Sequence, residues 1–518
     1  MTTLDWLVIA GYLVAMMALA IWLGRDQRTE RDYYLGGDLP APALATSILA
    51  TQCSTNSLLG APAFVGFAAG GGLLWLQYEL AVPLAMLGLA FLFPAVHRSG
   101  VISIYAFLEQ RLGRAARLTA SASFLFFRGI ATGVTVYGVA SVLSLITGVA
   151  YVPAVALLMG VTVCYDVIGG MRAVVISDVV QMLLLIAAVV VSLIWLAPDL
   201  WQYADTLSHR SQALVNDWGL SGETNYGFWP MLFGGLFLYM AYYGCDQSQA
   251  QRLLAAKHEI DLNRILVFNG LMRFPLVLAY CLLGLSLAAY ALDRPEFIRE
   301  LPLTSSGEPN LNMVFPAFVL REFAPGLAGL AIVGLFAAAM SSIDSALNSL
   351  SASTLEDFLP ATSAGTERQR FMQSKVVTLC WGVFAIGFSF GVEHIASTLL
   401  ESINKVSSVV NGPLLGLFVV AVLLPGTASA IAVSGFAVGI ALNLVLWQFV
   451  PDVSWLWWNL SGCLTTLGVA MLLAGWRLSL ELGGSAARSI VVPTTSRRTL
   501  LAGFLTMLSI LMAIQALR

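Results

Sequence analysis

The sequence predicts an all-α polytopic membrane protein. The chain has 518 residues, of which 58% are hydrophobic and only 11% are charged, a balance that soluble globular proteins do not have. Its apolar stretches run for about 20 residues, the length of a membrane-spanning helix, and do not alternate in segments of about ten as in a β-barrel. The six cysteines lie in these apolar stretches without metal-type spacing. We therefore interpret them as small core residues.

Fourteen apolar segments follow one another along the chain. The first has no basic region before it and no cleavage site after it, so we expect a retained helix and not a signal peptide. The approximate limits of the fourteen segments are 4–24, 43–68, 72–96, 118–146, 149–168, 173–197, 227–248, 263–292, 326–354, 374–392, 402–424, 427–450, 454–475 and 498–516.

The positions of lysine and arginine predict the orientation. With the N-terminus outside, 18 of the 26 Lys and Arg fall in inner loops and five on the outer side. The other three, Arg128, Arg273 and Lys405, lie within apolar segments. Because cytoplasmic loops are rich in Lys and Arg, we expect a multi-pass protein of the inner (plasma) membrane with both termini on the outer face.

Two segments carry polar runs at membrane depth. The second has a polar run at 50–57 and the seventh has one at 239–248. They lie five segments apart, at corresponding positions in two halves of opposite topology, as an inverted repeat requires. Broken helices in a membrane line a cavity, so these runs predict a binding site. Ordinary polar contacts between packed helices are the alternative explanation.

A third polar cluster lies within the apolar stretch 327–350. Ser341, Asp344 and Ser345 stand at i, i+3 and i+4 and share one helix face, with Ala338 one turn earlier. A carboxylate at this depth is costly, and a hard cation such as Na⁺ would offset that cost. The alternative is that the serines bond back to carbonyls one turn before them.

Three motifs in the chain resemble those of the sodium:solute symporter family, and the resemblance covers about residues 5 to 475. Residues 169–181 match GG-x-x-A-V-x-x-[ST]-D-x-x-Q, residues 251–257 match QR-x-L-A-A-K, and the pair at 341–342 is followed by Asn348 and Ser349. The resemblance implies a LeuT-like core, a five-plus-five inverted repeat in which core helices 1 and 6 are broken. It also implies one transporter domain over 1–518. The parts would be an extra helix at 4–24, repeats at 43–197 and 227–424, and C-terminal helices at 427–516.

The resemblance also implies sodium sites, with one or two Na⁺ as the coupling ion in each cycle. The main site would use carbonyls of Ala50, Cys53 and Ala338 with hydroxyls of Ser341 and Ser342. Some members bind a second Na⁺, for which the matching residues are Asp178, Ser341, Asp344 and Ser345. An ion pair between Asp178 and an arginine near the inner surface is the alternative.

The substrate site implied by the resemblance lies between the two broken helices. Its matching positions are Gln52, Asn56, Ser57, Tyr78, Glu79, Tyr242, Tyr243, Arg273 and Asn404. We add Arg128, which lies about 16 Å into the membrane at helical rise from Arg117. Arginine is a preferred partner of a carboxylate. The alternative is that Arg128 pairs with an intramembrane acid, namely Asp178, Asp246 or Glu79.

The function that these features predict is sodium-coupled import of a small polar organic solute. An organic anion is favoured, such as a monocarboxylate, an acidic sugar or a vitamin-like compound. A neutral solute such as a sugar is the alternative, and a membrane sensor is an alternative of another class. No His-Glu-x-x-His motif occurs, so we do not expect an enzyme. The expected partners are a small-molecule substrate and the lipid bilayer, without nucleic acid and without an obligatory protein partner.

Overall fold

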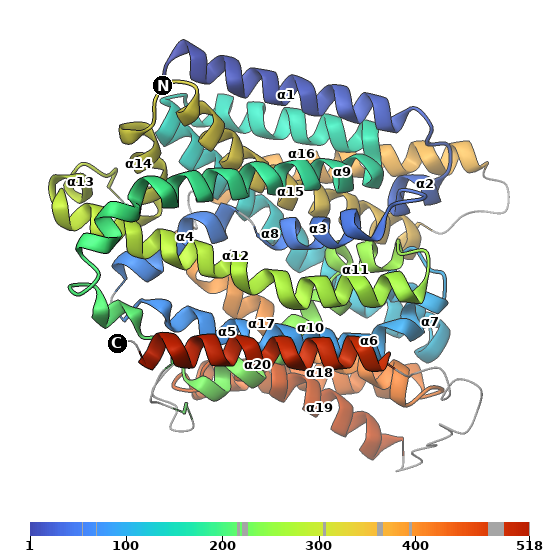
Figure 1. The fold of residues 1–518 in the computed structure, drawn as a ribbon. Coiled ribbons are helices and arrows are strands. Elements are labelled where there is room, and N and C mark those ends of the chain that lie inside the picture. The colour runs from blue at the N-terminus through green and yellow to red at the C-terminus, as the bar shows by residue number, and fades with distance from the viewer. Residues whose placement is uncertain are drawn as a thin grey trace.

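The computed structural model describes residues 1–53, 55–68, 70–214, 218–219, 226–303, 307–359, 366–392, 396–474 and 492–516. Over these ranges the chain is helical, and its only β-type pairing is an isolated bridge between Leu303 and Pro309. Figure 1 shows the long helices lying side by side with roughly parallel axes.

The first part of the chain forms nine helices before residue 203. These are α1 (Thr3–Gly24), α2 (Glu30–Leu35), α3 (Ala41–Gln52), α4 (Thr55–Phe67), α5 (Leu76–Glu79), α6 (Ala81–Arg98), α7 (Ile104–Leu112), α8 (Arg114–Thr147) and α9 (Tyr151–Gln202). Two short 3₁₀ turns, Leu73–Trp75 and Ser208–Ser211, accompany them.

The second part forms eleven more. These are α10 (Gly235–Cys245), α11 (Gln247–Leu254), α12 (Glu259–Asp293), α13 (Glu296–Arg299), α14 (Val314–Glu322), α15 (Leu327–Ser353), α16 (Glu367–Val392), α17 (Ala396–Leu423), α18 (Ser429–Phe449), α19 (Trp457–Leu473) and α20 (Thr494–Ala516). A π-helical turn, Pro230–Gly234, leads into α10, a 3₁₀ turn, Leu311–Met313, leads into α14, and a second π-helical turn, Thr354–Phe358, follows α15.

All fourteen predicted apolar segments coincide with helices of the structure. Among the described residues, ten helical stretches are long and apolar enough to cross a membrane, and Ser57–Phe67 and Trp457–Leu473 are shorter apolar helices. The all-helical membrane fold is therefore confirmed, whereas the number of crossings stays a prediction. The two segments predicted at 149–168 and 173–197 form the two halves of α9, which meet at a kink at Gly170.

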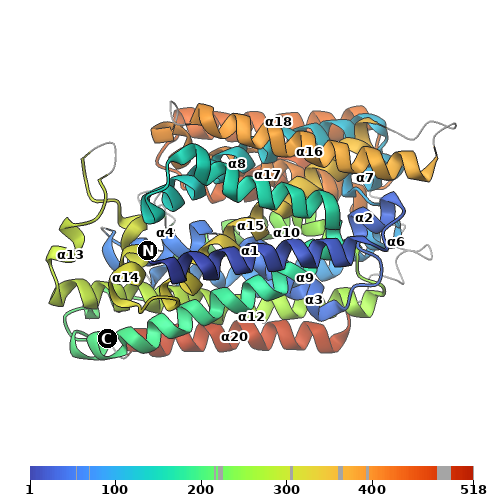
Figure 2. The same cartoon turned by 90° about the horizontal axis from the view of Figure 1, so that it is seen from above.

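Both chain ends lie at the same end of the helix bundle. In Figure 1 and Figure 2 the start of α1 and the end of α20 lie at the end of the bundle that holds α13 and α14, while α2 and α7 lie at the opposite end. The first helix is fixed to this end by Asp5, whose Oδ1 accepts hydrogen bonds from the backbone N–H groups of Gly326 (2.7 Å) and Gly329 (2.9 Å). This arrangement agrees with an even number of crossings.

Candidate functional site

The first predicted break lies between α3 and α4. Helix α3 ends at Gln52, and Cys53 has φ −83° and ψ 63°, outside the helical region. Helix α4 begins again at Thr55. The last carbonyls of a helix lack partners in the following turn, so this break leaves backbone oxygens available at the centre of the bundle.

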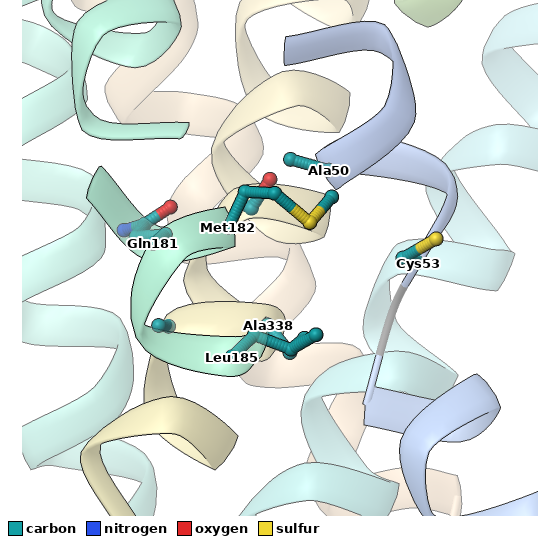
Figure 3. A pocket seen from close by; sticks show the side chains of 8 residues that line it. Ala50, Cys53, Gln181, Met182, Leu185 and Ala338 are labelled. Atoms are coloured by element: carbon teal, nitrogen blue, oxygen red, sulfur yellow. The ribbon is translucent and has the colours of Figure 1, made fainter. Parts of the chain in front are cut away.

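A small cavity lies beside this break, between α3, α9 and α15. Its volume of about 10 Å³ is near the space that one water-sized particle needs. Figure 3 shows its lining side chains, which come from Ala50, Cys53, Gln181, Met182, Leu185, Ala337, Ala338 and Ser341. Four of the five residues predicted for the main sodium site are in this lining.

The fifth residue, Ser342, connects the same two helices. Its Oγ donates to the carbonyl oxygen of Thr51 on α3 (3.2 Å) or to that of Ala338 on α15 (3.3 Å). The structure thus brings all five predicted residues together at one place.

Gln181 is a cavity residue that the sequence analysis did not assign. Its Nε2 donates to the hydroxyl of Tyr12 on α1 (3.0 Å), and its buried Oε1 has no partner among the described residues. Figure 3 shows this oxygen turned toward the cavity and the nitrogen turned away. The sequence motif at 169–181 could have indicated this role for Gln181, because Asp178 and Gln181 stand at i and i+3 and share one helix face.

The four residues predicted for a second sodium site are close together, but an arginine lies among them. Ser341 Oγ donates to Asp178 Oδ1 at 2.5 Å. Arg252 of α11 places its Nη2 at 3.2 Å from Asp178 Oδ2 and also donates to Ser345 Oγ. Arg252 is 1% exposed. A guanidinium therefore contacts two of these four residues, and the ion-pair alternative for Asp178 is the arrangement observed.

The second predicted break separates α10 from α11. Asp246 has φ −89° and ψ 119°, and its Oδ1 caps α11 by accepting from the N–H of Ser248 (2.8 Å). Its other oxygen, Oδ2, faces Nη1 of Arg128 at 3.6 Å. The alternative in which Arg128 pairs with an intramembrane acid is thus observed. The Nε of Arg128 is buried without a hydrogen-bond partner among the described residues.

Glu79 and Arg273 pair with each other. Arg273 donates from Nε to Glu79 Oε2 (2.6 Å) and from Nη2 to Glu79 Oε1 (3.2 Å). The Tyr239 hydroxyl accepts from Arg273 Nη2 (3.0 Å) and donates to Glu79 Oε1 (3.2 Å), and the ring of Tyr78 packs on that of Tyr239 with centroids 4.8 Å apart. The carboxylate neutralises the positive charge of Arg273. Arg273, one of the predicted substrate residues, is therefore already paired with a carboxylate.

The remaining predicted substrate residues are distributed around the two breaks. The rings of Tyr242 and Tyr243 meet edge to face at 5.6 Å. The buried Tyr243 hydroxyl and Gln52 Oε1 have no hydrogen-bond partners among the described residues. Ser57 is half-buried on α4. The side chains of Asn56 and Asn404 lie outside the part of the chain that the structure describes.

The chain is similar to known transporters over most of its length. It is 30% identical to the Drosophila melanogaster protein named "Putative sodium-dependent multivitamin transporter", over 84% of this chain and 73% of that protein. It is 28% identical to sodium-coupled monocarboxylate transporter 1 of Mus musculus (85% and 72%) and 25% identical to the Homo sapiens sodium/iodide cotransporter (85% and 69%).

The fold is also that of a solved symporter. A substrate-bound, outward-open Na⁺-coupled sialic acid symporter aligns with a TM-score of 0.80 at 24% identity, covering 92% of this chain and 98% of that one. The family model of the sodium:solute symporters matches residues 33–439. The chain therefore belongs to the sodium:solute symporter family, as a Na⁺-coupled membrane transporter and not an enzyme.

Proposed function

We propose that the protein imports a small organic anion together with Na⁺, and that Na⁺ binds in the cavity between α3, α9 and α15. The ligands would be the carbonyls of Ala50, Cys53 and Ala338 and the hydroxyls of Ser341 and Ser342. Neutral oxygen ligands suit a monovalent hard cation, whereas Ca²⁺ would require more carboxylates. The Oε1 of Gln181, held toward the cavity by Tyr12, would add a sixth oxygen.

The observation that supports an anionic substrate is that the Arg128 guanidinium has incomplete hydrogen bonding among the described residues. Its pairing with Asp246 is long, at 3.6 Å, and its Nε has no hydrogen-bond partner in the part of the chain that the structure describes. A carboxylate accepts two parallel hydrogen bonds from a guanidinium, so an incoming organic anion fits Arg128 better than Asp246 does. Arg273 lacks this freedom because Glu79 already binds it through two hydrogen bonds. Monocarboxylate and iodide, which name two of the relatives, are anions.

Na⁺ and substrate would be coupled through the break between α3 and α4. The Na⁺ ligands Ala50 and Cys53 flank Gln52, whose unpaired Oε1 belongs to the proposed substrate site. A bound Na⁺ would order this segment and connect it to α15, and the substrate would then bind an already ordered surface. Two ligands that bias one structural element bind cooperatively. A second Na⁺ at Asp178 and Ser345 would have to displace the guanidinium of Arg252.

The proposed topology has fourteen crossings with both termini outside. The repeats would be 43–197 and 227–424, with the extra helix at 4–24 before them and helices 427–516 after them. In this arrangement α11, α2 and α7 lie toward the inner face. Substrate and lipid would be the partners of this single domain.

A neutral solute such as a sugar is a second candidate, because each of the two intramembrane arginines already faces a carboxylate. A sensor using the same fold is a third. Uptake separates the three functions: an anion carrier and a sugar carrier accumulate different compounds, and a sensor accumulates neither.

Uptake into proteoliposomes tests the proposal. The purified full chain is reconstituted, and radiolabelled L-lactate, nicotinate and D-galactose are offered with an inward gradient of NaCl or KCl. We expect Na⁺-dependent accumulation of a carboxylate, reduced at least tenfold in Arg128→Met. The matched control Arg264→Met, at an exposed site on α12, should transport as wild type. Accumulation of galactose alone would support the neutral-solute alternative, and no Na⁺-dependent uptake or counterflow of any of them would contradict the proposal.

A further inference from the structure

The loop that follows α9 reaches the far end of α4, the helix after the first break. Arg210, in the 3₁₀ turn Ser208–Ser211, donates from Nη1 to the carbonyl oxygens of Val65 (3.2 Å) and Ala68 (3.1 Å). These carbonyls lie at the end of α4, where backbone oxygens have no partner further along the helix. Among the described residues, they are the only hydrogen-bond partners of the Arg210 side chain.

Helix α4 has few other polar contacts with its surroundings. It packs closely on α12, where a Cβ on Gly66 would lie 2.4 Å from the carbonyl oxygen of Gly284. Small residues let two backbones approach in this way, but they supply no hydrogen-bonding side chain. At the start of α4, the Thr55 hydroxyl donates to the carbonyl of Leu335 at 3.4 Å. Among the described side chains, only this hydroxyl and Arg210 form hydrogen bonds that join α4 to another element.

The loop that carries Arg210 is attached to the C-terminal helix as well. The Oε1 of Gln515, in the last turn of α20, accepts from the backbone N–H groups of Ala213 (3.1 Å) and Leu214 (3.2 Å). Ala213 is fully buried, in one apolar cluster with Leu511 of α20 and Val65 of α4. The loop therefore contacts both helices and connects α20 to the end of α4.

Helix α4 connects this loop to the proposed sodium site. Its first residue, Thr55, stands two positions after Cys53, whose carbonyl is a proposed Na⁺ ligand. Cys53 is not helical, so its placement depends on where α4 lies. Packed secondary elements carry coupling between distant positions. A side chain that fixes one end of α4 therefore also affects the Na⁺ ligand beside the other end.

We propose that Arg210 is a positioning residue for Na⁺ binding, which holds α4 where it completes the sodium site, and that α20 fixes Arg210 through Gln515. The inference rests on the proposed sodium site beside Cys53. Without Arg210, apolar packing alone holds the far end of α4, Cys53 is less firmly placed and Na⁺ binds more weakly. The C-terminal helix thus influences Na⁺ affinity, although it contributes no residue to the lining of the cavity.

Hydrogen exchange of the purified full chain, measured by mass spectrometry, tests the attachment of α4 without a known substrate. We expect the α4 amides of Arg210→Met to exchange faster than those of wild type in KCl, because methionine donates no hydrogen bond to the two carbonyls. Gln515→Leu should have a smaller effect in the same direction, since Arg210 is still present. Arg299→Met, at an exposed site on α13, should exchange as wild type. Unchanged exchange of α4 in Arg210→Met would overturn the inference, whether or not Na⁺ binds.

The Na⁺ concentration that gives half of the thermal stabilisation separates a positioning role from a merely structural one. In Arg210→Met it should rise about threefold to tenfold, the factor that corresponds to the net free energy of one or two hydrogen bonds. The gain at saturating NaCl should stay as in wild type, and Arg210→Lys, which keeps a donor, should restore most of the affinity.

Two other results would have different meanings. A lower melting temperature of Arg210→Met in both salts, with an unchanged half-saturating Na⁺ concentration, would make Arg210 a structural residue only and overturn the inference. Equal stability of wild type in NaCl and KCl would overturn the proposed sodium site and with it the role of Arg210 in Na⁺ binding, whereas hydrogen exchange would still report the attachment of α4.

Discussion

At the scale of single residues, the polar side chains in this membrane protein fall into two groups. Glu79 and Arg273 satisfy each other and Tyr239 with short hydrogen bonds, as a structural ion pair does. Arg128, Tyr243 and Gln52 each have a buried polar atom without a hydrogen-bond partner among the described residues. The first group fixes helix positions, and in the proposed function the second group would offer hydrogen bonds to the solute.

The Glu79–Arg273 pair gives a stability prediction. Glu79→Gln leaves the Arg273 guanidinium buried without its carboxylate, which costs about 3–5 kcal/mol of unfolding free energy for a buried pair. The double variant Glu79→Gln, Arg273→Met removes that uncompensated charge and should be more stable than Glu79→Gln alone. Denaturation of the purified variants in detergent measures both differences. If the double variant is no more stable than Glu79→Gln alone, the charges are not coupled as the geometry indicates.

At this scale the sequence predicted much of the candidate site, but it did not predict which acid each buried arginine contacts. The face formed by Ser341, Asp344 and Ser345 follows from helical spacing alone. The contacts of Arg252 with Asp178 and of Arg273 with Glu79 join residues 74 and 194 positions apart. Local periodicity does not report which of several buried acids a buried arginine will meet, so these pairs required the fold.

At the scale of elements, the longest helix, α9, is divided at a glycine whose backbone conformation is not helical. Helix α9 has 52 residues and would be about 78 Å long if straight, far more than the ~30 Å hydrocarbon core. Gly170, with φ 52° and ψ −160°, divides it. The apolar pattern predicted two segments here, and the glycine pair at 169–170 marked the boundary. Helix α11, which follows the second break, is held against α9 and α15 by Arg252 and Gln251, and an apolar pattern cannot predict these contacts.

Gly170 also gives a prediction about folding. A Cβ at this position would lie 2.7 Å from the Tyr33 ring and 2.8 Å from its carbonyl oxygen, in a backbone conformation that only glycine adopts readily. Gly170→Ala should therefore strongly reduce the yield of folded protein. Gly160→Ala, in the same helix with no atom within 4 Å of the new Cβ, should lose nothing. Size-exclusion profiles of the two variants compare them, and equal monodisperse yields would contradict this account of the kink.

At the scale of the whole molecule, both chain ends lie at one end of the bundle (Figure 2). The inner loops of the predicted topology hold most of the Lys and Arg, which agrees with termini on the outer face. The sequence predicted this arrangement from loop charge and from an even number of segments. It could not predict how α1 attaches to the bundle, because Asp5 meets Gly326 across 321 positions.

Sidedness can be measured by thiol labelling of intact cells. A membrane-impermeant maleimide should label Thr3→Cys and Ala516→Cys, at the two chain ends, and should not label Asp26→Cys just beyond α1. Wild type is the background control, since four of its six cysteines are buried. Cys164 and Cys380, which the sequence led us to expect in the core, are instead exposed on the apolar helices α9 and α16. Labelling of Asp26→Cys without labelling of the chain ends would reverse the proposed orientation.

The central claim is a sodium site between the α3–α4 break and the hydroxyls of α15. Its most direct test compares the Na⁺-dependent thermal stability of wild type and Ser342→Ala. A ligand at 100 times its Kd stabilises the folded state by about 2.7 kcal/mol. Wild type should therefore melt at a higher temperature in NaCl than in KCl. Ser342→Ala should need several-fold more Na⁺ for half of that gain, while Ser349→Ala, two turns further along α15, should match wild type. Equal stability of wild type in the two salts, or an unchanged Na⁺ requirement in Ser342→Ala, would contradict the site.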